Sequence, residues 1–207
     1  MLAVSAFAGD ANLDGLLKSV ETRYNRAKTL QVLFREDYTP PGPGGGPARR
    51  SESGRLMLQK PGRMRWDYSQ PKGKLFICDG KFMWLYTPAE NRAERMKLQE
   101  SDDMRAPLAF LLGKLNFEKE FRNLQARPEG AGAGTRILAE PKSGNLPYSA
   151  VEFVVTGENR IREVKVTGFD NSILDFTFDE ERLDPPLDGK LFQFRAPPGT
   201  AVVESGE

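Results

Sequence analysis

Few residues in this sequence have the types and spacing that catalysis or metal binding requires. The chain contains no histidine and one cysteine, Cys78. There is thus no histidine to act as a general base or zinc ligand, and one cysteine cannot form a metal cluster or an intrachain disulfide. Two acidic runs, residues 102–103 and 179–181, stand beside predicted turns, where solvated charge is the usual role. We expect no enzyme, no metal and no cofactor, and leave open a carboxylate pair that only the fold would assemble.

The composition is that of a globular chain without a dominant charge. Over 207 residues, 30 Lys and Arg oppose 29 Asp and Glu, which gives a formal net charge of +1. No bulk positive field is present to hold a polyanion, so nucleic acid is not an expected partner. Cys78 lies within an apolar run and is interpreted as a core residue. The length favours one domain.

The N-terminus has the character of an export signal. Residues 2–8 are apolar and end in Ala6-Phe7-Ala8, the small-x-small form of a signal-peptidase site. We interpret residues 1–8 as the remnant of a signal peptide and residues 9–207 as one mature, soluble, exported domain; an ordinary frayed terminus is the alternative. No other apolar run reaches the roughly 18 residues that a membrane span needs.

The chemistry that the sequence does offer is apolar. Two stretches, "RMRWDY" and "KFMWLY", alternate in the manner of strands, and each places aromatic side chains in phase. These in-phase side chains are Met64, Trp66, Tyr68, Phe82, Trp84 and Tyr86. An ordinary core explains any one of them, but the set together predicts a wall that encloses a large interior or a ligand.

The elements that position this wall form a mainly β pattern. Residues 13–30 carry one apolar stripe and predict a helix, and residues 30–39 then alternate as a strand. Proline and glycine make residues 40–47 a loop, and residues 127–135 a turn. Asp79-Gly80 predicts a hairpin. A second apolar helix is predicted within residues 106–124. Further strands are predicted at residues 54–59, 63–68, 74–78, 81–86, 135–140, 150–156, 161–167, 172–178 and 191–195.

Strands that follow one another without crossover helices pair antiparallel in sequence order. We therefore predict a mainly β fold: an incomplete antiparallel β-barrel, or curved sheet, with helices covering its concave apolar face.

The run "GRLMLQKPGRMRWDYSQPKGKLFICDGKFMWLYTP", residues 54–88, resembles the central signature of the LolA family of outer-membrane lipoprotein carriers. Phe34 stands where the family has a phenylalanine in its first strand. "APLAFLLG", residues 106–113, falls where the family keeps a lid helix. "LFQFRAPPGTAVVE", residues 191–204, resembles the closing strand. The order and spacing of these segments cover nearly the whole chain.

The resemblance implies a half-barrel closed by a helical lid that shields the acyl chains of lipoproteins in the periplasm. It implies three partners: the acyl chains of lipoproteins, an inner-membrane ABC lipoprotein-releasing transporter and an outer-membrane lipoprotein acceptor. A monomer is expected. The alternatives are a related half-barrel binder of another lipid or glycolipid, and a lipoprotein sensor. A lipid-anchored acceptor would need a cysteine directly after its signal sequence, and Cys78 is far from that position.

The site residues predicted from the aromatic pattern and the resemblance line the apolar cavity. They are Phe34, Leu58, Met64, Trp66, Ile77, Phe82, Trp84, Leu108, Phe110, Leu111 and Leu112. We expect the empty protein to be closed, with the last four packed against a wall formed by Trp66 and Trp84.

Lys60 is the departure from the family pattern. Family members have arginine before the proline, where it forks hydrogen bonds to the lid, and lysine cannot reproduce that planar fork. Lid gating is therefore assigned to Lys60, Arg63 and Arg65 together, and a solvated surface charge is the alternative for Lys60.

Overall fold

The structure is a computed structural model that describes residues 7–42, 49–97, 115–132, 134–144 and 146–204. The helices are α1 (Phe7–Arg26) and the single-turn α2 (Phe117–Glu120). The strands are β1 (Thr29–Thr39), β2 (Arg50–Gln59), β3 (Arg63–Gln70), β4 (Leu75–Cys78), β5 (Phe82–Thr87), β6 (Arg92–Lys97), β7 (Phe121–Pro128), β8 (Thr135–Pro141), β9 (Tyr148–Val155), β10 (Ile161–Gly168), β11 (Ile173–Leu183) and β12 (Ala201–Glu204).

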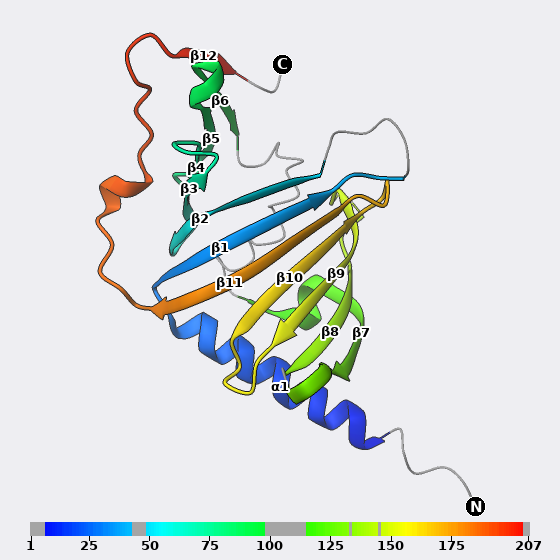
Figure 1. Cartoon of the computed structure of the whole chain (residues 1–207). Coiled ribbons are helices and arrows are strands. Elements are labelled where there is room, and N and C mark those ends of the chain that lie inside the picture. The colour runs from blue at the N-terminus through cyan, green and yellow to red at the C-terminus, as the bar shows by residue number, and fades with distance from the viewer. Residues whose placement is uncertain (1–6, 43–48, 98–114, 133, 145, 205–207) are drawn as a thin grey trace, which may run out of the picture.

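These strands form one 12-stranded sheet in the order β12-β6-β5-β4-β3-β2-β1-β11-β10-β9-β8-β7. Neighbouring strands pair antiparallel except for β12 and β6, which are parallel. β1 lies in the middle, between a meander of β2 to β6 and a meander of β7 to β11. The two edge strands, β12 and β7, do not pair, so the curved sheet stays open (Figure 1). The predicted fold class is confirmed.

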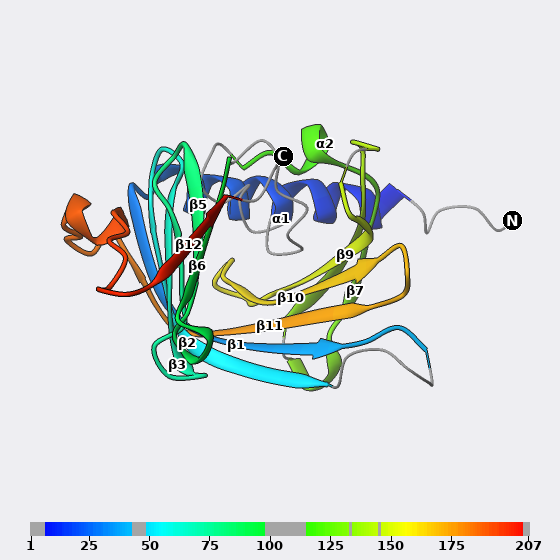
Figure 2. The same cartoon turned by 90° about the horizontal axis from the view of Figure 1, so that it is seen from above.

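Helix α1 lies across the concave face of the curved sheet (Figure 2). Its apolar residues Leu13, Leu17, Val20 and Tyr24 recur at steps of three and four, and all four side chains are buried. They join one hydrophobic cluster with side chains from β1, β3 and β8 to β11. The helix ends at Arg26, earlier than predicted, because β1 already begins at Thr29. We call the face of the sheet toward α1 the inner face and the opposite one the outer face.

The outer face differs between the two meanders. On β8 to β10 it carries charged side chains, where Arg136 pairs with Glu129, Glu152 and Glu163. On β3 to β5 it is covered by residues 184–200, which we call the strap, including the 3-10 turn η5 (Gly189–Phe192). Figure 1 shows the strap in orange and red, running from the end of β11 to β12.

Several predicted elements are corrected by the structure. Residues 191–195 are not a strand: they belong to the strap, and the closing strand is β12 alone. Residues 92–97 and 121–128 form strands β6 and β7, which the pattern analysis did not predict. Within the predicted helix of residues 106–124, residues 106–114 lie outside the described part, and only residues 117–120 are helical. Among the described residues, no helix combines the length and apolar character that a membrane crossing needs.

Candidate functional site

The inner face carries a continuous aromatic wall at its centre. Trp66 on β3 is fully buried, with its ring centroid 4.6 Å from that of Phe34 on β1 and 5.6 Å from that of Phe176 on β11. Phe34 and Tyr68 meet edge to face at 5.1 Å. Gly54 of β2 pairs with Phe34 on one side and with Tyr68 on the other. A side chain would not fit at this position, because an added Cβ would lie 2.1 Å from the Asp67 carbonyl oxygen. Three strands thus supply one unbroken apolar surface.

Aliphatic and sulfur-containing side chains extend this wall toward β2, β4 and β5. Leu58, Met64, Cys78 and Met83 are paired in register across four strands and are all buried. The Cys78 thiol donates to the Gly62 carbonyl oxygen at 3.3 Å, and burial raises its pKa. A buried, protonated thiol of this kind is unreactive, so Cys78 acts here as a packing residue.

A polar cluster holds the C-terminal half of α1 onto the sheet. The Tyr24 hydroxyl donates to Glu181 Oε2 at 2.6 Å and accepts the backbone N–H of Ile161 at 2.9 Å. Arg23 forms an ion pair with the same carboxylate, whose side chain is only 3% exposed. Burial, together with the charge of Glu181, raises the pKa of Tyr24, so its hydroxyl remains a donor. We call Arg23, Tyr24 and Glu181 the latch.

Lys60 supports the same end of α1 from the turn between β2 and β3. Its ammonium donates to the Tyr24 carbonyl oxygen at 2.6 Å, and its backbone N–H donates to the Lys28 carbonyl at 2.9 Å. The last carbonyls of a helix lack intrahelical partners and carry partial negative charge, so a cation stabilises them. Burial lowers the pKa of Lys60, and the charge of Asp184 opposes that shift. Lys60 therefore caps α1 and is not a free surface charge.

Two further side chains of α1 form hydrogen bonds with the backbone of residues 115–117, just before β7. Asn25 donates to the Leu115 carbonyl at 2.8 Å and accepts the Leu115 N–H at 2.6 Å, like a strand neighbour. Glu21 accepts the Phe117 N–H at 2.8 Å. Sequence reasoning missed Asn25, Glu21 and the latch, because their partners lie about 90 to 160 residues away and no local pattern marks them.

The structure divides the predicted cavity residues between the two faces. Phe34, Leu58, Met64 and Trp66 belong to the inner cluster. Leu108, Phe110, Leu111 and Leu112 lie outside the described residues. The expected wall of two tryptophans is wrong, because Ile77, Phe82 and Trp84 face the other way.

Contacts with the strap show where the outward-facing residues lie. The Trp84 ring packs on Phe194 of the strap with ring centroids 5.0 Å apart. Arg95 covers Phe82 and Trp84 at 4.5 and 5.5 Å from their ring centres. In the register, Trp84 pairs with Ile77, which pairs with Arg65, so all three share the outer face.

Arg63 and Arg65, also predicted to gate the lid, make their described contacts on the outer face. Arg65 pairs with Asp67 at 2.7 Å and donates to the Leu191 carbonyl of the strap at 2.8 Å. Arg63 is exposed and donates to Gln59 Oε1 at 3.0 Å. Both side chains lie on the face opposite to α1. Of the three predicted gating residues, only Lys60 contacts a helix that closes the inner face.

Three hollows border α1 or its contacts with the sheet. One of about 10 Å³ lies among Tyr24, Leu30 and Lys60, and another of about 10 Å³ lies among Leu56, Phe178 and their neighbours. Each has room for about one water-sized sphere and none for a hydrocarbon chain. Among the described residues, these two hollows leave no room for a hydrocarbon chain between α1 and the wall.

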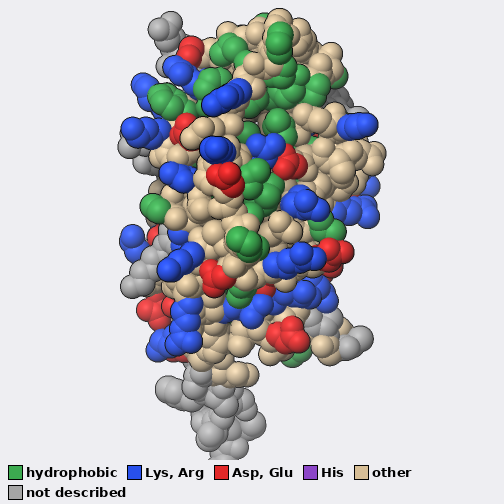
Figure 3. All heavy atoms as spheres, turned by 90° about the vertical axis from the view of Figure 1, so that its left-hand side faces the viewer, with side chains coloured by type: hydrophobic (Ala, Val, Ile, Leu, Met, Phe, Trp, Pro, Cys, Tyr) green, Lys and Arg blue, Asp and Glu red, His purple; other side chains and the backbone are tan. Residues whose placement is uncertain are grey.

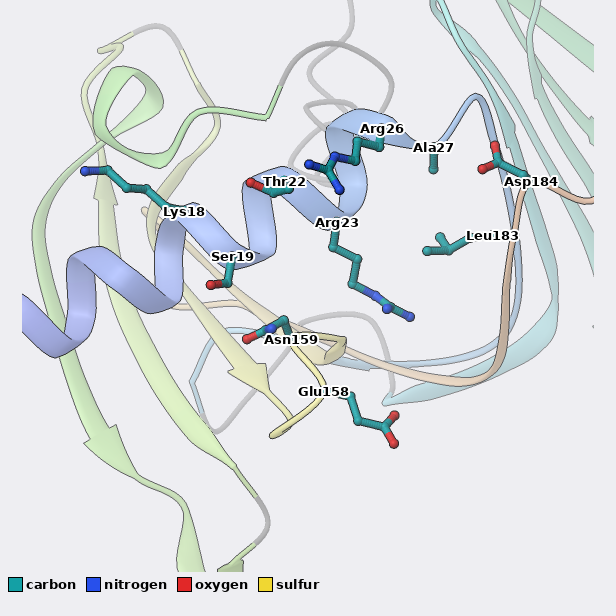
Figure 4. A pocket seen from close by; sticks show the side chains of 10 residues that line it. All are labelled: Lys18, Ser19, Thr22, Arg23, Arg26, Ala27, Glu158, Asn159, Leu183 and Asp184. Atoms are coloured by element: carbon teal, nitrogen blue, oxygen red, sulfur yellow. The ribbon is translucent and has the colours of Figure 1, made fainter.

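The third hollow is larger and polar. It measures about 580 Å³ and lies along the flank of α1. Figure 4 shows Arg23 reaching from α1 into the space beside Glu158 and Asn159 of the β9–β10 turn. Lys18 and Asp184 add charge to its lining. A hydrocarbon chain would desolvate these groups, so this hollow is not an acyl site.

Comparison with known proteins assigns the chain that carries this inner wall to a family. The family model described as "Outer membrane lipoprotein carrier protein LolA" matches residues 33–195. The chain belongs to the LolA family. An outer-membrane lipoprotein carrier protein from Nitrosomonas europaea is 28% identical over 187 residues, covering 90% of this chain and 88% of that protein. One from Chromobacterium violaceum is 28% identical over 177 residues, covering 86% and 82%.

Solved structures share the fold of this LolA-family chain. An uncharacterized conserved protein from Thermus thermophilus aligns with a TM-score of 0.55 at 12% identity, covering 94% of this chain and 99% of that one. A putative outer membrane lipoprotein-sorting protein domain from Vibrio parahaemolyticus aligns with a TM-score of 0.50 at 12% identity, covering 84% and 95%. At these identities the likeness concerns the architecture alone.

Proposed function

We propose that this LolA-family protein is a periplasmic carrier that shields the acyl chains of lipoproteins against the inner face of its sheet. The observation that carries the proposal is the aromatic wall around Trp66, buried beneath a helix that polar contacts fasten at one end. An apolar surface of this extent, covered by one amphipathic helix, can exchange α1 for hydrocarbon. Family membership supplies the class of cargo.

Energetics favour an empty protein that is closed. Burying one acyl chain of about 14 methylenes contributes roughly 11 kcal/mol at about 0.8 kcal/mol each. Several chains held in a ready-made cavity would approach the practical ceiling of non-covalent affinity, and release would become too slow for a carrier. Separating α1 from the wall offsets part of that gain, because inner-face contacts must be broken before the chains enter.

The proposed route of the cargo has two ends. The carrier accepts a lipoprotein from an inner-membrane ABC transporter and passes it to an outer-membrane acceptor, acting as a monomer without a cofactor or catalytic step. Among the described residues, no group of three His, Cys, Asp or Glu is placed to hold a metal ion. The proposed export rests on the signal-peptide character of residues 1–8.

A direct test uses the two tryptophans, which lie on opposite faces. Trp84→Phe leaves Trp66 as the reporter of the inner wall, and Trp66→Phe leaves Trp84 as the reporter of the outer face. We expect a synthetic triacylated lipopeptide to change the emission of the Trp66 protein and to leave that of the Trp84 protein nearly unchanged. The complex should elute as a soluble species in size-exclusion chromatography. No lipopeptide binding, or an equal response from both tryptophans, would contradict the proposal.

Lys60 is proposed as the gating residue, acting through α1. Lys60→Ala removes the cation at the last carbonyls of the helix, so α1 should separate more easily and lipopeptide capture should accelerate. Stopped-flow fluorescence of Trp66 measures the rate. Lys72→Ala, an exposed charge in the β3–β4 turn, is the matched control. Equal capture rates for the two variants would remove Lys60 from the mechanism.

The identity of the natural cargo needs a separate measurement. An apolar wall responds to the length and bulk of a hydrocarbon more than to its head group. Native mass spectrometry of the protein purified from its own periplasm would identify the lipid that accompanies it. Acylated peptides would support the proposal of a lipoprotein carrier. A glycolipid or another free lipid would instead support the alternative, a half-barrel binder of that lipid.

A further inference from the structure

A second pocket lies on the outer face, on the opposite side of the sheet from the acyl site. It measures about 580 Å³ and is formed where the strap crosses β3 and β4. Its lining consists of Arg65, Leu75, Ile77, Lys190, Gln193, Phe194 and Arg195. Figure 3 views the side of the molecule that carries the strap, where Lys and Arg side chains lie among hydrophobic ones. A volume of this size is typical of small-molecule sites.

The framework of this pocket is fixed by contacts on several sides. Ile77 is 1% exposed and forms part of the lining. Arg65 is held by Asp67 and by the Leu191 carbonyl, which ties β3 to the strap. Phe194 packs on Trp84 at 5.0 Å. The pocket is therefore preformed, and a ligand would not have to order the strap to bind there.

The strap is also fastened at both ends. At its start, Asp184 Oδ1 accepts the Lys28 N–H at 2.6 Å. At its end, Asn91 donates to the Gly199 carbonyl at 2.8 Å, and the Ala201 N–H donates to the Asn91 carbonyl at 2.9 Å. A segment held in this way keeps Lys190 and Arg195 in the lining of one pocket.

The lining combines positive charge with apolar surface. Arg65 uses its guanidinium on Asp67 and Leu191, so its charge is largely compensated. Lys190 and Arg195 form no ion pair within the described part of the chain. Leu75, Ile77 and Phe194 supply the apolar part of the lining. A ligand complementary to this arrangement has one anionic group and a short hydrocarbon portion.

We propose that the outer pocket binds a phosphate-bearing amphiphile, with its phosphate near Lys190 and Arg195 and its hydrocarbon portion against Leu75 and Phe194. Such a group is present both in a free phosphate ester and in the head-group region of an anionic phospholipid. The site is separate from the acyl wall, so it can be occupied while α1 is closed.

Isothermal titration calorimetry with monomeric dihexanoyl phosphatidylglycerol tests this proposal. We expect binding to wild type, and a loss of affinity of about tenfold in Lys190→Gln/Arg195→Gln, as two charge contacts of modest strength predict. Lys119→Gln/Arg127→Gln removes two exposed cations near the opposite edge of the sheet and should bind as wild type does. Raising the salt concentration should weaken binding in wild type.

Matched probes separate the contribution of the ligand's charge to binding from that of its hydrocarbon portion. Dihexanoyl phosphatidylcholine, which has no net charge, should bind at least about tenfold more weakly than the phosphatidylglycerol, and so should glycerol phosphate, which has no hydrocarbon portion. Binding to phosphatidylglycerol vesicles but not to the monomer, with the same loss in Lys190→Gln/Arg195→Gln, would support a bilayer as the source. Equal binding of the charged and uncharged lipids, or no loss in the double variant, would overturn the proposal.

The acyl site provides the remaining control. Lys190→Gln/Arg195→Gln should capture the triacylated lipopeptide as wild type does, because neither residue contributes to the inner cluster. If lipopeptide competes with dihexanoyl phosphatidylglycerol for one site, the short lipid occupies the inner wall and the outer pocket is not its site. A failure of lipopeptide binding with intact phosphatidylglycerol binding would instead count against the carrier and leave the outer pocket in place.

Discussion

Trp66 and Trp84 lie on strands β3 and β5 of the same sheet, yet their surroundings differ completely. Trp66 faces inward, is fully buried and contacts the rings of Phe34 and Phe176. Trp84 faces outward and lies between Arg95 and Phe194 of the strap. The inner side is closed by a helix held at its end, whereas the outer side is closed by an irregular segment fastened along its length. Of these two covers, α1 is the one that consists of a single regular element.

This difference assigns different roles to similar side chains. Hydrocarbon placed against Trp66 would replace contacts made by α1, a single element whose polar contacts cluster near its C-terminal end. Hydrocarbon placed against Trp84 would have to displace Phe194 while hydrogen bonds hold the strap on both sides of it. The proposed carrier function therefore predicts that the inner wall exchanges its contacts for hydrocarbon while the outer one keeps its contacts.

The largest expected effect is the contrast in stability between the two tryptophans. Trp66→Ala should lower the free energy of unfolding by about 3–5 kcal/mol, because it leaves a large cavity in a closed core. Trp84→Ala should cost about 1–2 kcal/mol, since its ring is partly exposed. Urea denaturation measures both. Equal losses would show that the strap and α1 are equivalent covers.

Trp66→Phe sharpens this first comparison. The Trp66 Nε1 atom is buried and has no hydrogen-bond partner among the described residues. Leaving a buried donor unpaired costs about 1–3 kcal/mol. Phenylalanine removes that cost, which offsets part of the packing free energy lost with the smaller ring. Trp66→Phe should therefore be far milder than Trp66→Ala. A full loss in both variants would mean that the indole N–H has a partner in solution.

The faces of the strands mark the limit of what the sequence predicts. In β3, polar residues alternate with Met64 and Trp66, and the structure buries both of these side chains in the inner cluster. In β5, Met83 and Leu85 are apolar as well as Trp84, so alternation leaves the two faces indistinguishable. Only the register with β4 and the position of the strap decide between them, and neither is a local property of the sequence.

The strap shows the same limit in another form. Phe192 and Phe194 alternate with Gln193, which is the pattern of a half-buried strand. β3 and β4 already pair with strands on both edges, so no ladder position is open where the strap crosses them. Its aromatic residues pack on a face of the sheet instead. A segment packed in this way shows the same alternation of apolar and polar residues as a half-buried strand. Strands β6 and β7 escaped prediction because their side chains are mostly polar and lie near the sheet edges.

A smaller contrast compares the latch with an ion pair of the outer face. Glu181→Gln removes the charge that Arg23 and Tyr24 share in a nearly closed site, so we expect a loss of about 1–3 kcal/mol in unfolding free energy. Glu204→Gln breaks an exposed pair with Arg95 and should cost less than about 1 kcal/mol. Denaturation curves compare the two.

Labelling of the single thiol tests whether the latch controls opening. Cys78 lies in the inner cluster, so a maleimide should react with it faster in Glu181→Gln, where α1 is held less firmly. Glu204→Gln should label at the rate of wild type. Unchanged labelling in Glu181→Gln, despite its lower stability, would place the opening elsewhere than at the latch.

The smallest expected effect is a pH dependence that originates at Cys78. Burial raises the pKa of this thiol above its ordinary value of 9.0. As the pH passes that value, the unfolded chain loses a proton that the native state still holds, so the free energy of unfolding falls. The contribution is complete below pH 9 and disappears as the pH rises through the native pKa. Cys78→Ala should therefore show a flatter decline above pH 9 than wild type. Parallel curves would mean that the thiol is exposed to solvent often enough to titrate normally, and the inner wall would then be open without any cargo.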